Sequence, residues 1–238
     1  MSKQNTRRVL FFTDIHGPYH HIDMFDFLDA VKQKYRPTYV VCGGDEGDNH
    51  ALSLHDSDPD LDSAGAELRK LQAVMSDLAM MFPRLDICES NHGSLVYRRA
   101  KKNGIPAHYI KPYIDILFPV NPPEWIWAEN FRAVLPNGHT VEFIHQTAGH
   151  LLNAAAHKRC CLVTGHQHAR FEIVYGASTA ALYWQMIGGS LVDNSALAFA
   201  YGKQFPKKPI VGCSLILNSI PVLQPMLLNS EGRWVGKL

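Results

Sequence analysis

The sequence predicts an α/β protein whose central sheet is largely parallel. Short apolar runs typical of buried strands alternate with helical patterns over the first half of the 238-residue chain. The first three of these runs are each followed by polar residues, and the second half of the chain is richer in strands. A β–α–β–α–β order of this kind is typical of α/β proteins with a parallel core sheet.

The first half supplies three strands and two helices. The predicted strands are the apolar runs Val9–Thr13, Tyr39–Cys42 and Leu85–Cys88. Apolar residues at helical spacing predict helices over Ile22–Tyr35 and Leu61–Phe82, and Pro83 stops the second one. The longer helix is expected to pack on the core, because its apolar residues recur at alternating steps of three and four.

The second half is expected to be mostly β. Its strands are joined by Gly, Asn and Pro turns, and they are predicted over Val141–His145, Cys161–Thr164, Phe171–Tyr175, Ala181–Ile187, Val211–Leu217 and Pro221–Asn229. The sequence contains no internal repeat. Since the candidate site residues come from both halves, we predict a single domain over residues 1–238.

The composition indicates an ordinary globular protein, with 46% hydrophobic and 19% charged residues. The 23 Lys and Arg residues against 22 Asp and Glu give a net charge of +1, which argues against bulk-charge binding to DNA or membranes. Five cysteines without a C-x-x-C spacing predict free thiols. No segment resembles a secretory signal or a membrane span, so we expect a cytoplasmic protein without a membrane partner. Nothing in the sequence predicts an oligomeric state.

Residues with metal-binding side chains follow five of the predicted strands. They are Asp14, His16, Asp45, Asp48, Asn91, His92, His145, His166 and His168. Because the carboxyl ends of parallel strands share one edge of a sheet, where ligands bind, these residues are expected to meet in one crevice. Mixed imidazole and carboxylate ligation suits manganese, iron or zinc better than calcium. A carboxylate such as that of Asp45 can bridge two such cations.

The order of these motifs resembles that of the calcineurin-like metallophosphoesterase superfamily, and the chain is similar to small stand-alone members of phage type. The matching stretches are Asp14-Ile15-His16, Gly44-Asp45-Glu46-Gly47-Asp48, Asn91-His92, His145 and Gly165-His166-Gln167-His168. Together they span about two-thirds of the chain. The resemblance implies a four-layer α/β/β/α sandwich, with two mixed β-sheets face to face and helices outside.

The resemblance also implies a role for each residue. The ligands of one divalent metal ion would be Asp14, His16 and His168. The ligands of a second would be Asn91, His145 and His166, with Asp45 bridging the two ions. Manganese is expected first, with iron, zinc, nickel or cobalt as alternatives. A hydroxide bridging the two ions would attack phosphorus, His92 would protonate the leaving oxygen as general acid, and Asp48 would orient the site or pair with His92.

Two points stay open within the resemblance. The family usually has Gly-Asn-His followed by an acidic residue, whereas this chain has Ser90-Asn91-His92-Gly93, which puts the substrate class in doubt. The lone histidine ligand is also ambiguous. His145 is preferred because it ends a predicted strand, but His150 and, less so, His139 compete with it.

The prediction is a metal-dependent phosphoesterase acting on a phosphate ester. Arg98 and Arg99 are candidate phosphate contacts, although such a basic run is more often a solvated helix face. A phosphodiesterase or nuclease acting on nucleotides or nucleic acid is the main alternative. The basic clusters Arg98–Lys111 and Lys203–Lys208 favour it, and the near-neutral net charge opposes it. A non-catalytic metal-dependent scaffold is the third hypothesis, supported only by the altered Asn-His motif.

Overall fold

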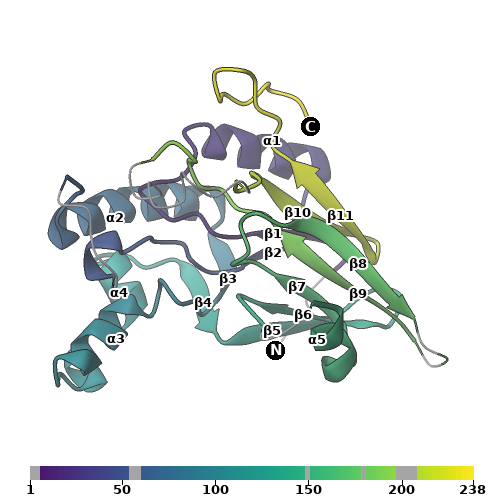
Figure 1. The fold of residues 1–238 in the computed structure, drawn as a ribbon, viewed down its shortest axis with the longest axis horizontal. Helices are drawn as coiled ribbons and strands as arrows, with labels where there is room; N and C mark the ends of the chain where they lie inside the picture. Colours follow the sequence, from purple (N-terminus) through teal and green to yellow (C-terminus); the bar gives the residue numbers. More distant parts are fainter. Residues whose placement is uncertain (1–5, 54–59, 148–150, 178, 180, 197–207) are drawn as a thin grey trace.

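Two β-sheets pack face to face, and helices cover their outer faces (Figure 1). The computed structural model describes residues 6–53, 60–147, 151–177, 179, 181–196 and 208–238. The four-layer α/β/β/α sandwich that the resemblance to the metallophosphoesterase superfamily implies is therefore confirmed.

The first sheet has six strands in the order β11-β10-β1-β2-β3-β4. Their bounds are Arg8–Phe12 for β1, Tyr39–Cys42 for β2, Arg84–Cys88 for β3, Glu124–Ala128 for β4, Gly212–Leu217 for β10 and Ile220–Pro225 for β11. Strands β1 to β4 pair in parallel, whereas β10 pairs antiparallel with β1 and with β11. The carboxyl ends of the four parallel strands therefore lie along one edge of this sheet.

The second sheet has five strands in the order β5-β6-β7-β9-β8. Their bounds are Asn130–Val134 for β5, Thr140–Ile144 for β6, Cys161–Thr164 for β7, Phe171–Ala177 for β8 and Leu182–Gly188 for β9. Strands β6, β7 and β9 are parallel, and the edge strands β5 and β8 are antiparallel to their neighbours. Both sheets are mixed, as predicted.

The helices are α1 (Met24–Tyr35), α2 (Ala64–Met81), α3 (Leu95–Lys102), α4 (Tyr113–Leu117) and α5 (Leu151–Lys158), with two 3₁₀ turns, η1 (His50–Leu52) and η2 (Ala107–Tyr109). Helices α1 and α2 bury Phe27, Leu28 and Met75 with apolar side chains of the first sheet, and α5 packs Ala155 near Leu162 of the second sheet. Within the described part of the chain, none of the helices has the length and apolar character that a membrane span requires.

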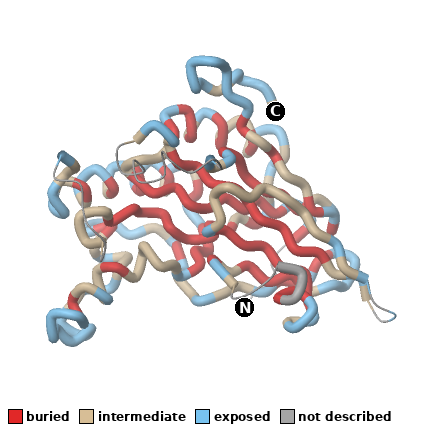
Figure 2. Tube along the Cα trace, viewed as in Figure 1, coloured by how far each residue is buried: buried red, intermediate tan, exposed pale blue. Residues whose placement is uncertain are grey.

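Strand β1 shows why the buried strands are continuously apolar. Leu10 and Phe12 belong to the core on the helix side of the first sheet, whereas Val9 and Phe11 belong to the core between the sheets. Phe11 packs against Phe143 of the second sheet with ring centroids 6.0 Å apart. Because both faces of β1 are covered, every position favours an apolar residue, and buried chain fills the middle of the molecule (Figure 2).

Six elements have no counterpart in the sequence prediction: α4, α5, β4, β5 and the 3₁₀ turns η1 and η2. The predicted helix over Ile22–Tyr35 also begins two residues later, at Met24. Ile22 lies outside the helix and is 71% exposed, so its apolar side chain does not mark the buried face.

Candidate metal centre

The carboxyl ends of five strands meet at one place between the two sheets. After β1 and β2, the amide of Asp14 donates to the carbonyl of Gly44 (3.0 Å). After β6 and β7, the amide of Gly165 donates to the carbonyl of His145 (3.0 Å). The two pairs are joined by the amide of His166, which donates to Asp14 Oδ2 (2.9 Å). The predicted convergence of the polar residues is therefore present in the structure.

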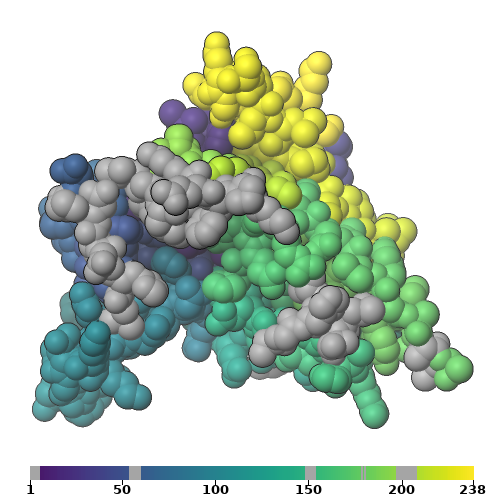
Figure 3. Space-filling view, in the orientation of Figure 1, coloured from purple at the N-terminus to yellow at the C-terminus, as the bar shows by residue number. Residues whose placement is uncertain are grey.

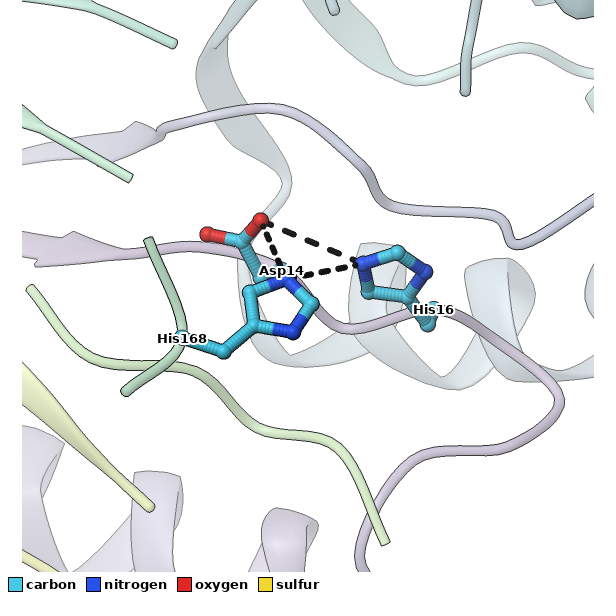
Figure 4. A group of neighbouring side chains, drawn as sticks. All are labelled: Asp14, His16 and His168. Carbon is cyan, nitrogen blue, oxygen red and sulfur yellow. Dashed lines mark hydrogen bonds and ion pairs between the residues drawn. The ribbon is translucent and has the colours of Figure 1, made fainter. Parts of the chain in front are cut away.

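Asp14, His16 and His168 form the first group, and their ligand atoms lie within 4.8 Å of one another (Figure 4). His168 Nε2 lies 3.0 Å from Asp14 Oδ1, and His16 Nε2 lies 3.9 Å from the same oxygen. The two histidine Nε2 atoms are 3.2 Å apart. Three donor atoms therefore face one small volume, which is the geometry that a metal ion needs.

The other oxygen of Asp14 is held by the protein itself. Asp14 Oδ2 accepts hydrogen bonds from Thr13 Oγ1 (2.6 Å) and from the amide of His166, so Oδ1 is the oxygen that faces the histidines. Residue 165 has to be glycine here, because a Cβ at Gly165 would lie 2.1 Å from Thr13 Oγ1. The close approach of these two loops thus fixes the orientation of the carboxylate.

Asp45, His145 and His166 form the second group, again with ligand atoms within 4.8 Å. His145 Nδ1 donates to the carbonyl of Gly43 (2.8 Å), which leaves Nε2 facing the group. The side-chain oxygen of Asn91 lies 2.7 Å from that Nε2 atom. The four residues of the predicted second position are therefore together, with His166 the most exposed of them.

Asp45 lies between the two groups. Its Oδ2 atom is 3.3 Å from His145 Nε2 and 3.7 Å from His16 Nε2, so one oxygen faces both sets of histidines. Its Oδ1 atom accepts a hydrogen bond from the amide of His92 (3.0 Å). The preceding Gly44 has φ +93°, and a Cβ there would lie 2.6 Å from the carbonyl oxygen of Cys88. Glycine at this position allows the turn to bring Asp45 over the end of β3.

Protonated histidines balance the negative charge of the aspartates in the candidate centre. Burial disfavours a proton on His16, but Asp14 and Asp48 outweigh it and raise the pKa of His16 to about 10. Burial is likewise outweighed at His145, where Asp45 raises the pKa to about 9. The same contacts hold the pKa of Asp14 and of Asp45 below the usual range, against the effect of burial. Buried carboxylates that need this much positive charge nearby are a chemically suitable site for divalent cations.

His92 lies at the rim of both groups. Its Nδ1 atom donates to the backbone carbonyl of Asp48 (2.5 Å), and its ring meets the His16 ring edge-on with centroids 4.6 Å apart. A third set of ligand atoms within 4.8 Å joins His92 to His16 and Asp45, so the ring reaches the centre itself. Burial and the neighbouring His16 lower the pKa of His92.

The prediction for Asp48 was that it orients the site or pairs with His92, and its carboxylate lies closer to His16 than to His92. Its Oδ1 atom accepts the hydrogen bond of His16 Nδ1 at 2.7 Å and lies 3.6 Å from His92 Nδ1. The side chain thus orients His16, whereas His92 is held by the backbone of the same residue. Spacing alone could not separate these two contacts, since both rings lie beside Asp48.

The sequence prediction missed Asn49 and Glu46. Asn49, at φ 53°, donates from its side-chain amide to the carbonyl of His92 (3.1 Å). Glu46 is 1% exposed and accepts a hydrogen bond from Trp127 Nε1 (3.2 Å), and burial raises its pKa to about 7. The signal for Asn49 was its position directly after Asp48, since Asn tolerates the left-handed conformation that a turn requires.

Of the two arginines predicted to contact phosphate, only Arg98 lines a pocket next to the second group. Arg98 lines a pocket of about 430 Å³ beside the second group, and its Nη1 atom donates to the carbonyl of Asn91 (3.3 Å). The pocket is lined by Glu89, Ser90, Asn91, Ser94, Arg98, Glu129, Ile144, His145 and Gln146. Arg99 is not among these lining residues.

The structure describes two of the three candidates for the lone histidine ligand. His145 occupies the second group, whereas His139 is exposed in the turn that precedes β6, at the opposite end of that strand. His150 lies outside the described residues, as does most of the basic cluster Lys203–Lys208.

A scan against protein-family models finds no match, and no curated protein matches the chain. Among solved structures, the chain is similar to Vacuolar Protein Sorting 29 from Cryptosporidium parvum, with 14% identity, 91% of this chain and 86% of that chain covered, and a TM-score of 0.46. It is also similar to Vps29 from Chaetomium thermophilum, with 12% identity, 96% and 92% covered, and a TM-score of 0.45.

Proposed function

We propose that this protein is a metal-dependent phosphoesterase that holds two divalent cations. The observation that supports it is the pair of ligand groups, Asp14–His16–His168 and Asp45–His145–His166, whose atoms converge on either side of one carboxylate oxygen. Asn91 would complete the second position. The mixed nitrogen and oxygen donors suit manganese first, and iron, zinc, nickel or cobalt as alternatives.

Two cations held this way would supply Lewis acidity toward the phosphoryl oxygens and would lower the pKa of water, which would provide the nucleophile at neutral pH. The remaining chemistry belongs to the protein. Asp45 and Asp14 would supply the negative charge that holds the cations, and Asp48 orients His16 by accepting the hydrogen bond of its Nδ1 atom, which leaves Nε2 to bind a cation.

His92 is proposed as the general acid. With Nδ1–H donated to the carbonyl of Asp48, its protonated form would keep Nε2–H for donation to the leaving oxygen of an ester bound at the centre. The P–O bond to the leaving group breaks as a water oxygen bonds to phosphorus, and the proton of His92 passes to the leaving oxygen. Arg98, on the wall of the adjoining pocket, is proposed to bind a phosphoryl oxygen.

The test begins with metal analysis of the purified protein. Bis(4-nitrophenyl) phosphate and 4-nitrophenyl phosphate are then offered with each metal restored, and phenyl phosphate, whose leaving group is more basic, is used to compare variants. We expect turnover that depends on the metal, and we expect His92→Ala to retain its metals while losing most turnover of phenyl phosphate. An exposed histidine far from the centre, His139, provides the matched control as His139→Ala.

A non-catalytic scaffold predicts a different result. The altered Asn91-His92-Gly93 motif favours it, because Gly93 has no carboxylate to orient His92. In that case the protein would bind metal ions at both positions, yet no phosphate ester would be hydrolysed with any metal. Full metal occupancy without turnover of either aryl ester would therefore refute the proposed activity.

A further inference from the structure

A basic arm extends from the rim of the candidate metal centre. We use this name for residues 95–111, which comprise α3, η2 and the chain that joins them to Lys111. The arm carries the cations Arg98, Arg99, Lys101, Lys102 and Lys111. No acidic residue occurs between Glu89 and Asp115, although the whole chain holds 22 of them. Positive charge is thus concentrated here in a protein with a net charge of only +1.

The arm is exposed and its charges are not neutralised by the protein. Residues 101–109 are all exposed, and Figures 1 and 2 show α3 at the outer corner of the molecule, away from both sheets. Over the described residues, none of the five cations lies within ion-pair distance of a carboxylate. Elsewhere in the described chain, six Lys and Arg side chains are paired: Lys70, Arg84, Arg132, Lys158, Arg170 and Arg233.

The basic arm also carries aromatic side chains close in sequence to these cations. Tyr109 is 75% exposed and its ring meets the ring of His108 with centroids 4.5 Å apart. The hydroxyl of Tyr97 donates to the carbonyl of Lys111, which ties the end of the arm back to α3. Exposed aromatic rings between cations form the type of surface on which unpaired bases stack while the cations contact phosphates.

Arg98 joins the arm to the centre. It belongs to α3, and it also lines the pocket that holds Asn91 and His145, two residues of the second ligand group. The space-filling view shows the arm as a projection at the lower left, continuous with the body of the molecule (Figure 3). Glu89 and Glu129 also line this pocket, so Arg98 is the lining residue that would attract a phosphate.

We propose that the basic arm binds single-stranded nucleic acid and that the substrate of the centre is a phosphodiester within that strand. This inference rests on the proposed phosphoesterase function and names its substrate class. Phosphates would contact the cations of the arm, bases would stack on Tyr109, and the strand would enter the pocket along Arg98. Hydrolysis would then break one P–O bond of the diester, with water supplying the new oxygen on phosphorus and a proton passing to the leaving oxygen.

The experiment compares two variants with the same loss of charge. Lys101→Gln/Lys102→Gln removes two cations from the arm, and Arg69→Gln/Lys237→Gln removes two exposed, unpaired cations elsewhere. Binding of a fluorescent single-stranded oligonucleotide is measured by anisotropy over a range of salt concentrations. Hydrolysis of the oligonucleotide and of bis(4-nitrophenyl) phosphate is measured in parallel, and a duplex of the same sequence serves as a second ligand.

We expect the arm variant to bind the single strand about tenfold more weakly, and the slope of log K against log salt to fall by ~1.4 for two lost phosphate contacts. Its KM for the oligonucleotide should rise, while turnover of the small aryl diester stays unchanged. The control variant should match the unaltered protein in every assay. Equal weakening by both variants, unchanged binding by the arm variant, or stronger binding of the duplex would overturn the proposal.

Failure of the proposed activity would look different. If the unaltered protein hydrolyses neither the aryl diester nor the oligonucleotide with any metal, the phosphoesterase function is refuted. The anisotropy assay still reports on the arm in that case, because it requires no turnover. Conversely, turnover of the aryl diester without binding of the oligonucleotide would retain the activity and refute the substrate class.

Discussion

Asp48 Oδ1 lies 2.7 Å from His16 Nδ1, and this contact decides which ring nitrogen of His16 faces the candidate centre. A carboxylate behind a metal-ligating histidine fixes the ring and increases its basicity, and its loss typically costs 10–100-fold in metal affinity. We therefore expect Asp48→Asn to weaken metal binding by about tenfold at the Asp14–His16–His168 position. Calorimetric titration of the metal-free protein with Mn²⁺ measures this affinity.

Asp77→Asn provides the control for that variant, because Asp77 lies on an exposed face of α2 with no contact to the centre. We expect its metal affinity to equal that of the unaltered protein. Unchanged affinity in Asp48→Asn would show that the contact with His16 does not support metal binding.

Metal binding should release protons. Without a cation, the pKa of His16 is about 10 and that of His145 about 9, so both rings carry a proton at pH 8. A histidine has to be deprotonated at the nitrogen that binds a metal, so metal binding displaces those protons. The metal affinity therefore rises with pH until both rings have lost their protons. We expect release of about two protons per molecule at pH 8, measured with an indicator dye in weakly buffered solution.

The same titration with His145→Ala should release about one proton fewer, whereas His139→Ala should not change the count. Metal binding without any change in the indicator signal would contradict the assignment of His16 and His145 as ligands.

The strands were predictable where both of their faces are covered. The predicted bounds of β2 and β7 agree with the structure at both ends, because each is a continuous apolar run closed by polar or glycine-rich residues. Strand β4 was missed although Trp125–Ala128 is a continuous apolar run, because this run closely follows Pro122 and Pro123, which indicate a break. The strand lies at a sheet edge, where Ile126 is 59% exposed while the neighbouring Trp125 is buried. Helix α5 has eight residues, too few for a clear helical period.

The candidate site was predictable as a set of residues but not as a set of contacts. The motifs gave the residues that meet in the centre, since each motif directly follows a strand and the strand ends share an edge. Two roles stayed open for Asp48, orienting the site or pairing with His92, because Asp48 approaches His16 and His92 only after the chain has folded. The same holds for Asn49, whose hydrogen-bond acceptor, the carbonyl of His92, is 43 positions away in the chain.

Asn49 should act on His92 by positioning it. Its side-chain amide donates to the carbonyl of His92 (3.1 Å) and to the hydroxyl of Tyr113 (3.4 Å). Asn49→Gly removes these contacts while keeping a residue that accepts a positive φ. If His92 is the general acid, we expect about a tenfold lower kcat for phenyl phosphate, whose leaving group needs a proton, and little change for 4-nitrophenyl phosphate.

Asn218→Gly is the matched control, because Asn218 also has a positive φ (48°) but lies in the exposed turn between β10 and β11. It should leave both rates unchanged. An equal loss of kcat on the two esters in Asn49→Gly would indicate a general structural defect, and it would refute a specific effect on proton transfer.

The C-terminal segment should contribute stability that depends on pH through Asp23. The side chain of Arg233 donates to both carboxylate oxygens of Asp23, and the amide of Trp234 donates to Oδ2 (2.8 Å). Arg233 is the main cause of the lowered pKa of Asp23, which is about 2 against an ordinary 3.8. Because the pKa is lower in the folded state, the pair stabilises the protein above about pH 4, and this stabilisation is lost as the pH falls toward 2.

Since the Arg233 side chain is half exposed, we expect Arg233→Gln to cause only a small loss in the free energy of unfolding at pH 7. The difference from the unaltered protein should shrink as the pH falls from 4 to 2.5, because protonation of Asp23 removes its charge in both proteins. Urea unfolding followed by tryptophan fluorescence measures it, with Lys237→Gln as the control for loss of an exposed charge in the same segment. A difference that persists unchanged at pH 2.5 would mean that Arg233 stabilises the segment by packing alone.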